Sequence, residues 1–234
     1  MSVLLTVSLS AALPLSAASH VDVVKMRTEN QVNPLGIGTS TPRFSWQITS
    51  DRKGVVQTSY QILVASSREK LDRNEADLWD SGERNSDEQL WIPYQGKALL
   101  SGAQAYWKVR ITTNKGKSEW TEPQLFTIGL LGETKWSGTW IGLEDLQPGE
   151  QKGMHTRLAA RYIRKDFAAK GKVKRAVAYV AGLGVYEFYV NGQRMGGSQV
   201  LQPAPTDYRK TIYYNTFDVT SLLTEKNAIA IKLG

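Results

Sequence analysis

Acidic side chains are the groups in this sequence that could hydrolyse a bond, because two carboxyls can act as general acid and general base across it. The acids considered are Glu144, Asp145, Asp166, Glu187, Asp207 and Asp218. Their type alone does not distinguish a catalytic pair from the solvated face of a strand, which is where most acids lie. The sequence therefore contains acids but singles out no catalytic pair.

The sequence gives little basis for cysteine, histidine, metal or phosphate-binding sites. The chain has no cysteine, which excludes thiol nucleophiles, disulfides and cysteine-based zinc sites. Its two histidines, His20 at the end of the N-terminal apolar segment and His155 in a polar stretch, give little basis for a triad or a histidine-rich metal site. The glycines at 182, 184, 196 and 197 are not followed by the Gly-Lys-Ser/Thr of a phosphate loop.

The elements that must position any site are short strands. Apolar and polar residues alternate in Phe44–Ile48, Tyr60–Val64 and Trp107–Ile111, so each run is predicted to bury one face and expose the other. Leu125–Ile128 is a further strand, and no stretch has the pattern of an amphipathic helix of three turns or more. About seven such strands within residues 20–129 predict a fibronectin type III or immunoglobulin-like β-sandwich.

The second half has its own strand signals. Tyr186–Val190 alternates and is followed by Asn191-Gly192, two residues that tolerate the positive φ of a type I′ hairpin turn. Asp218–Leu223 is predicted to form a capped helical turn, and Ile229–Leu233 another buried strand. Residues 143–234 are therefore expected to form a second sandwich after a connector at 130–142. Glycines in this connector favour a hinge, whereas Trp136 and Trp140 favour a fixed interface.

Charge and the N-terminal segment bear on location. Met1–Ser19 is uncharged, apolar and ends in small residues, which indicates a signal peptide and a secreted or periplasmic protein. It lacks the usual preceding Lys or Arg, so a misplaced start codon or a disordered N-terminal tail stays open, and its apolar stretch is too short for a membrane span. The net charge is +7, but Lys170–Arg175 alternates with small or apolar residues like the wet face of a strand, so no nucleic-acid partner is expected.

Several stretches in order resemble the N-terminal region of bacterial α-L-rhamnosidases of glycoside hydrolase family 78. These are Arg164–Phe167, Gly182–Gly192, Pro205–Tyr208, Phe217–Leu223 and Asn227–Gly234, with Ser118–Gly129 and Trp136–Gly142 upstream. The resemblance implies an all-β chain of two consecutive sandwiches, the second a jelly-roll (galactose-binding-like) module truncated at its C-terminal end.

The resemblance also implies a function. Such enzymes remove terminal α-L-rhamnose from glycosides or polysaccharides with inversion, and their two catalytic carboxyls belong to a downstream (α/α) barrel. The present chain is therefore expected to be non-catalytic, with the barrel of the same polypeptide as its partner and no required cofactor. Two alternatives stay open: a free-standing rhamnose-binding module, and a fibronectin-like adhesion or interaction protein.

Some relatives of the second module bind rhamnose-containing glycans with the help of Ca²⁺, and the resemblance extends that expectation to this chain. The candidate carbohydrate-binding residues are Asp207, Tyr208 and Arg209, in a loop that follows two prolines. Relatives often have a tryptophan where this chain has Pro205, which weakens sugar stacking here. Pro205–Tyr208 could equally be a structural corner, and no metal ligands are assigned.

Overall fold

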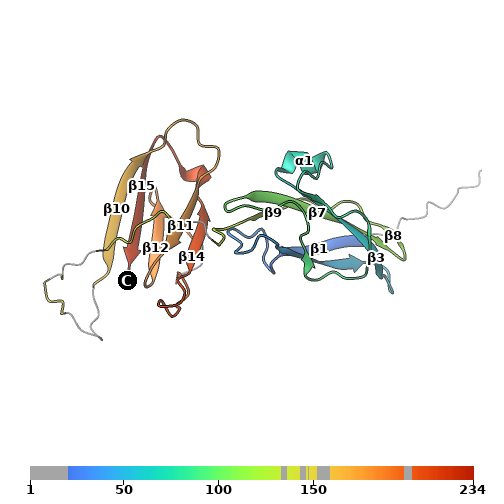
Figure 1. Ribbon diagram of the computed structural model, residues 1–234, viewed down its shortest axis with the longest axis horizontal. Coiled ribbons are helices and arrows are strands. Elements are labelled where there is room, and N and C mark those ends of the chain that lie inside the picture. Colours follow the sequence, from blue (N-terminus) through green and yellow to red (C-terminus); the bar gives the residue numbers. More distant parts are fainter. Residues whose placement is uncertain (1–20, 133–135, 143–145, 147, 152–158, 198–201) are drawn as a thin grey trace, which may run out of the picture.

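The computed structural model describes residues 21–132, 136–142, 146, 148–151, 159–197 and 202–234. They form two β-sandwiches arranged along the long axis of the molecule (Figure 1). The first contains β1 (Val21–Thr28), β2 (Arg43–Ser50), β3 (Gln57–Ala65), α1 (Arg68–Asp72), β4 (Trp79–Asp80), β5 (Arg84–Asn85), β6 (Ile92–Pro93), β7 (Gln104–Thr113), β8 (Gly116–Lys117) and β9 (Gln124–Thr127). The second contains β10 (Arg161–Ala168), β11 (Val177–Ala181), β12 (Tyr186–Val190), β13 (Gln193–Arg194), β14 (Tyr214–Asp218), the 3₁₀ turn η1 (Thr220–Leu222) and β15 (Lys226–Leu233).

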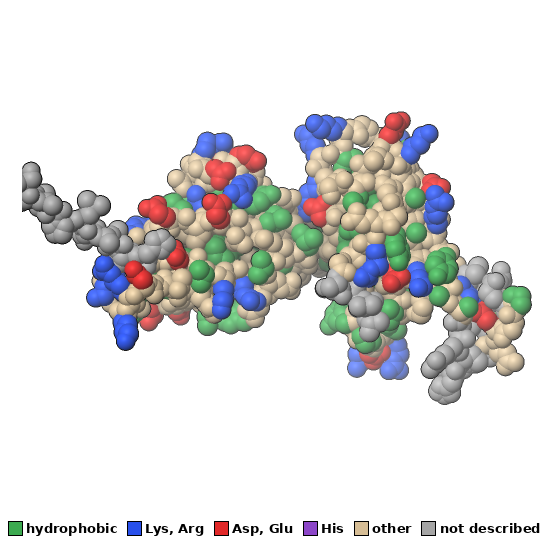
Figure 2. All heavy atoms as spheres, turned by 180° about the vertical axis from the view of Figure 1, so that it is seen from behind, with side chains coloured by type: hydrophobic (Ala, Val, Ile, Leu, Met, Phe, Trp, Pro, Cys, Tyr) green, Lys and Arg blue, Asp and Glu red, His purple; other side chains and the backbone are tan. Residues whose placement is uncertain are grey.

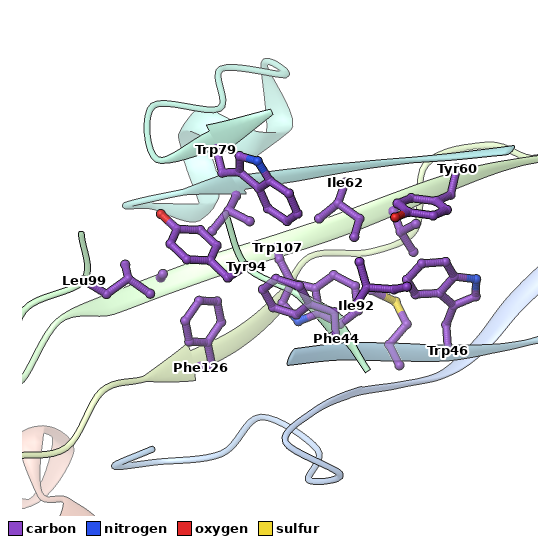
Figure 3. Packing of buried hydrophobic residues seen from close by; sticks show 14 of the residues in the cluster. Phe44, Trp46, Tyr60, Ile62, Trp79, Ile92, Tyr94, Leu99, Trp107 and Phe126 are labelled. Carbon is purple, nitrogen blue, oxygen red and sulfur yellow. The ribbon is translucent and has the colours of Figure 1, made fainter. Parts of the chain in front are cut away.

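The first sandwich packs a three-stranded sheet, β1-β2-β6, against a sheet of order β4-β3-β7-β8, in which β5 also pairs with β3 and β9 with β7. Its core is aromatic (Figure 3). The Phe44 ring lies 4.5 Å from that of Trp107 and 5.7 Å from that of Phe126. The predicted strands Phe44–Ile48, Tyr60–Val64 and Trp107–Ile111 are thereby confirmed, because their apolar residues face this core.

A buried amide supports the same core. The Trp46 indole N–H donates to Gln57 Oε1 at 3.0 Å, and Gln57 Nε2 donates to the carbonyls of Ser86 and Glu88. Gln57 is 2% exposed, so these bonds replace the water that its amide loses on folding. The network ties β2 and β3 to the loop that precedes β6.

The outer face of β7 is not solvated as the alternation suggested. Lys108 is 5% exposed, because α1 and Trp120 cover it, and its Nζ donates to the Leu71 carbonyl at 2.5 Å. Burial lowers the pKa of Lys108. The prediction of a wet polar face was wrong here because α1, a helix of five residues capped by Ser67, covers the sheet.

The second sandwich packs a four-stranded sheet, β10-β15-β12-β13, against the two-stranded sheet β11-β14. Phe188 of β12 meets Phe217 of β14 at 5.4 Å between ring centroids, and Tyr186 donates to the Val180 carbonyl. The hairpin prediction is confirmed, since Asn191 and Gly192 have φ of 49° and 82° between β12 and β13.

The second sandwich confirms one further expectation and contradicts another. The helical turn is present as η1, with Asp218 Oδ1 accepting from the Thr220 amide at 2.9 Å. The strand over Lys170–Arg175 was wrong: these residues form a loop between β10 and β11, with Gly171 at a φ of 70°. Within the described residues, neither helix has the length and apolarity that crossing a bilayer requires.

Candidate functional site

Asp207, Tyr208 and Arg209 lie together in one turn before β14. The Asp207 carboxylate accepts from the Arg209 amide at 3.2 Å and from its guanidinium Nε at 3.0 Å. The Asp207 carbonyl accepts from the amides of Lys210 and Thr211. We call this turn the Asp207 corner. Its carboxylate is already paired with Arg209 of the same turn.

The electrostatics of the corner follow from that pairing. The hydrogen bond from Arg209 lowers the pKa of Asp207, so this carboxylate stays ionised at neutral pH. The Tyr208 side chain is exposed beside the pair, where its ring could contact a ligand. The corner could therefore hold a sugar only at the open surface, by ring stacking and hydrogen bonds to the charged pair.

The other candidate acids have structural partners. Asp166 pairs with Arg164 at 2.8 Å across an exposed strand face, and Glu187 accepts from the Tyr189 hydroxyl at 2.9 Å. Asp218 accepts from the Thr220 amide at the start of η1, as described above. Glu144, Asp145, His20 and His155 lie outside the described residues.

Glycoside hydrolysis uses two facing carboxyls, so the acids that line three cavities in the described part of the chain decide whether hydrolysis can occur there. A cavity of about 520 Å³ near η1 has Glu225 as its single acid, and one of about 580 Å³ beside β2 has Asp87. The largest, about 790 Å³, lies inside the second sandwich and is lined by no acid. We call it the apolar groove. None of the three presents the required pair, and the described residues contain no cluster of three or more His, Asp or Glu that could hold a metal ion.

The two sandwiches meet where β14 lies beside the end of the first sandwich (Figure 1). Tyr214 Oη of β14 accepts from the Leu130 amide at 2.8 Å, and Arg175 Nη1 donates to the Gly102 carbonyl at 2.7 Å. The Tyr214 ring also lies 5.8 Å from those of Tyr179 and Trp136. Burial raises the pKa of Tyr179, as expected for a phenol held away from water.

Two glycines of the first sandwich permit this approach. A Cβ on Gly36 would lie 2.2 Å from Thr216 Oγ1, and a Cβ on Gly129 would lie 2.4 Å from Tyr214 Oη. Larger residues would push the sandwiches apart. The junction is therefore a docked interface rather than a free hinge, although Trp140, expected to contribute to it, is 61% exposed.

Of the junction residues, sequence reasoning found Trp136 but not its partners. Tyr214, Tyr179 and Arg175 fit ordinary strand or loop patterns, and Arg175 was assigned to a solvated face. Two signals were available: the glycines near residue 129, which favoured a hinge, and Trp136, which favoured a fixed interface and does lie against Tyr214.

Family models match most of the described chain. Residues 23–132 match the Rha78A-like N-terminal immunoglobulin domain, and residues 171–234 match the α-L-rhamnosidase N-terminal domain. The two models follow one another in the same order as the two sandwiches.

Curated relatives carry the same region as part of a longer chain. An α-L-rhamnosidase from Formosa agariphila is 36% identical over 92% of this chain and 24% of its own length. One from Alteromonas sp. is 35% identical over 85% of this chain and 22% of its own. The chain therefore spans about a quarter of the length of the relatives it matches.

Solved structures agree with this picture. The α-L-rhamnosidase from Dictyoglumus thermophilum superposes with a TM-score of 0.81 at 37% identity, over 91% of this chain and 25% of that one. The Aspergillus terreus α-L-rhamnosidase gives 0.74 at 26% identity, over 92% of this chain and 24% of that one. The chain belongs to the α-L-rhamnosidase family. It consists of the immunoglobulin-like domain and the rhamnosidase N-terminal domain that these enzymes contain.

Proposed function

We propose that this chain is the non-catalytic N-terminal part of an α-L-rhamnosidase that hydrolyses terminal α-L-rhamnose from glycosides or polysaccharides. The catalytic (α/α) barrel lies outside this chain in the same polypeptide. The observation that carries the proposal is the match of both sandwiches, in order, to about a quarter of the length of α-L-rhamnosidases. We place the domain boundaries at 20–129, 130–142 and 143–234.

The acids that line the cavities support a non-catalytic role for the two sandwiches. Inverting hydrolysis needs one acid to protonate the leaving oxygen and a second to activate water, with roughly 6.5–9.5 Å between them. Each described cavity has at most one acid. The chemistry is accordingly assigned to the downstream barrel.

The role of the two sandwiches is to present a shaped, rigid support to that barrel. The hydrogen bonds of Leu130 to Tyr214 and of Arg175 to Gly102 fix one sandwich against the other. A barrel that packs on both would thereby be held in one orientation. On the face shown in Figure 2, Lys and Arg are interspersed with Asp and Glu, which favours a protein contact over a polyanion site.

Hydrolysis of an aryl α-L-rhamnoside tests the proposal. The 234-residue chain should show no turnover, whereas the longer polypeptide encoded by the same gene should release the aglycone. Turnover by the purified 234-residue chain, or a longer polypeptide with no rhamnosidase activity, would refute the assignment.

Sugar binding by the Asp207 corner is a second candidate function, favoured by the exposed Tyr208 ring beside the charged pair. We expect weak binding of L-rhamnose, strengthened if Ca²⁺ joins the Asp207 carboxylate. Calorimetry with and without Ca²⁺ measures this, and Tyr208→Ala should abolish the heat while Tyr213→Ala, also exposed, should not. Absence of heat at millimolar rhamnose would count against this candidate.

We also propose that the protein is secreted or periplasmic, because Met1–Ser19 has the apolar run and small terminal residues of a signal peptide. Expression of the gene in a bacterial host followed by N-terminal sequencing of the secreted or periplasmic product tests this. A mature protein starting near His20 supports it, and an intact Met1 in the cytoplasmic fraction contradicts it.

A further inference from the structure

Trp91 is an aromatic side chain that the first sandwich holds at its surface, just before β6. Its neighbour Ile92 points into the core, as Figure 3 shows, whereas Trp91 is 42% exposed. The backbone of Trp91 has a φ of 60°, a left-handed conformation that is unfavourable for a bulky residue. Its amide donates to Ser45 Oγ of β2 at 3.0 Å, which helps to hold this conformation. Residues in such strained conformations cluster at ligand sites, so Trp91 is a candidate binding residue.

Arg43 of β2 supports the Trp91 ring and keeps hydrogen-bond donors for a ligand. Its guanidinium carbon lies 4.1 Å from the centre of the ring. The Nε and Nη2 atoms of Arg43 donate to the Glu29 carboxylate at 3.0 and 2.7 Å, and the Arg43 amide donates to the same carboxylate at 2.7 Å. These three bonds fix the guanidinium beside the ring. Within the described residues Nη1 of Arg43 has no hydrogen-bond partner, so it can donate to a ligand hydroxyl.

The cavity of about 580 Å³ beside β2 lies next to Trp91 and is rich in polar groups. We call it the polar cavity. Ser45, which bonds to the Trp91 amide, and Gln47, which lines the cavity, are two residues apart on β2. They therefore lie on the same face of the strand, about 7 Å apart, a distance that one pyranose unit can bridge. Amide, guanidinium and carboxylate groups of the lining come from Gln47, Arg52, Asp87 and Gln89.

The loop that borders the polar cavity is fixed by hydrogen bonds to the sandwich. The buried Gln57 amide donates to the carbonyls of Ser86 and Glu88, and the Gln89 carbonyl accepts from a β2 amide at 3.0 Å. In the described part of the chain, the side-chain amides of Gln47 and Gln89 form no hydrogen bond, so both can bond to hydroxyl groups. A site that is already ordered loses little conformational entropy when a ligand binds.

These groups match a carbohydrate better than a protein partner. A pyranose ring stacks its C–H face on an aromatic ring, and its hydroxyls bond to amides and charged groups at the rim. The centre of a protein interface is usually apolar and poor in charged residues, unlike the polar cavity. The apolar groove of the second sandwich lacks such polar groups, because no carboxylate or amide side chain lines it among the described residues.

We propose that Trp91, Arg43 and the polar cavity form a binding site for a glycan chain of two or more pyranose units. One unit stacks on the exposed part of the Trp91 ring, and one of its hydroxyls accepts from Arg43 Nη1. The next unit lies in the polar cavity, where the amides of Gln47 and Gln89 bond to its hydroxyls. The site goes beyond the supporting role proposed above, and only the choice of a rhamnose-terminated glycan as ligand rests on the proposed function.

Titration of the 234-residue chain with a tetrasaccharide that ends in α-L-rhamnose tests the site by ¹H–¹⁵N NMR. The resonances of the Trp91 indole and of the amides of residues 86–91 should shift. L-rhamnose alone should bind about tenfold more weakly or worse, because it fills one part of the site. Trp91→Ala should weaken tetrasaccharide binding about tenfold or more, whereas Trp91→Tyr, which keeps a ring, should retain most of the affinity. Trp140→Ala is the matched control, because Trp140 is 61% exposed in the connector.

Several outcomes would overturn the site. Equal affinities of Trp91→Ala and wild type, or shifts confined to the Asp207 corner, would place the sugar elsewhere. A dimer of the 234-residue chain that Trp91→Ala dissociates would make Trp91 a contact between copies. The site and the proposed function fail separately. Hydrolysis by the longer polypeptide without binding at Trp91 overturns the site alone, and binding at Trp91 with an inactive longer polypeptide supports the site and overturns the function.

Discussion

Asp77 couples the stability of the first sandwich to pH. Its carboxylate accepts from Lys70 Nζ at 2.6 Å and from the amide and hydroxyl of Ser66, so it joins α1 to the end of β3. Partial burial raises the pKa of Asp77, but these hydrogen bonds outweigh burial and bring the pKa down to about 2. A carboxylate with a depressed pKa stabilises the folded state above its unfolded pKa, and that stabilisation is lost as the pH falls toward 2.

Asp77→Asn should therefore cost about 1–2 kcal/mol of unfolding free energy at pH 7, after allowance for solvent screening, and almost nothing near pH 2. Urea unfolding at a series of pH values between 2 and 7 measures the difference from wild type. Asp87→Asn, in an exposed loop, is the matched control. A deficit for Asp77→Asn that stays constant across this range would show that the carboxylate charge is not what matters.

At the scale of elements, Asn191 connects the β12–β13 turn to the rest of the second sandwich. Its Nδ2 donates to the Leu222 carbonyl and to Asn227 Oδ1, and its Oδ1 accepts from the Ala228 amide. Asn191→Gly keeps the positive φ but removes these bonds, so it should cost about 1–3 kcal/mol. Gly192→Ala meets no neighbour and should cost only the strain of its φ of 82°, about 1 kcal/mol. Urea midpoints that rank the two the other way would show that turn conformation dominates.

Strand and turn signals are local, and the sequence predicted them well. Alternation located β2, β3, β7, β12 and β15, and Asn191-Gly192 located the hairpin. It missed α1, because five residues are too few to show a helical period, and it misread Lys170–Arg175, because alternation also occurs in loops. The Asp207 corner was visible as a local motif. The junction was not, because its partners, such as Leu130 and Tyr214, are 84 positions apart.

At the scale of the whole molecule, the junction between the two sandwiches is held by other interactions than the interior of each sandwich. Among the described residues, the buried apolar side chains of the two sandwiches form two separate clusters. The specificity of the junction comes from glycines that allow backbone and side chains to approach, and from the hydrogen bonds to Leu130 and Gly102. Such an interface can be opened without unfolding either domain.

Gly129→Ala is the change that should open it. Its Cβ would lie 2.4 Å from Tyr214 Oη of the other sandwich, so the sandwiches must separate and the Leu130–Tyr214 bond, worth about 1 kcal/mol, is lost. The same Cβ would lie 2.8 Å from the Gly36 carbonyl, a contact within the first sandwich. In wild type, residual dipolar couplings from both sandwiches should fit one alignment tensor, and in Gly129→Ala they should require two. Gly38→Ala, whose Cβ meets nothing within 4 Å, should behave as wild type. Should Gly129→Ala still fit a single tensor, the linker and not the close contact at Tyr214 would be what sets the angle between the sandwiches.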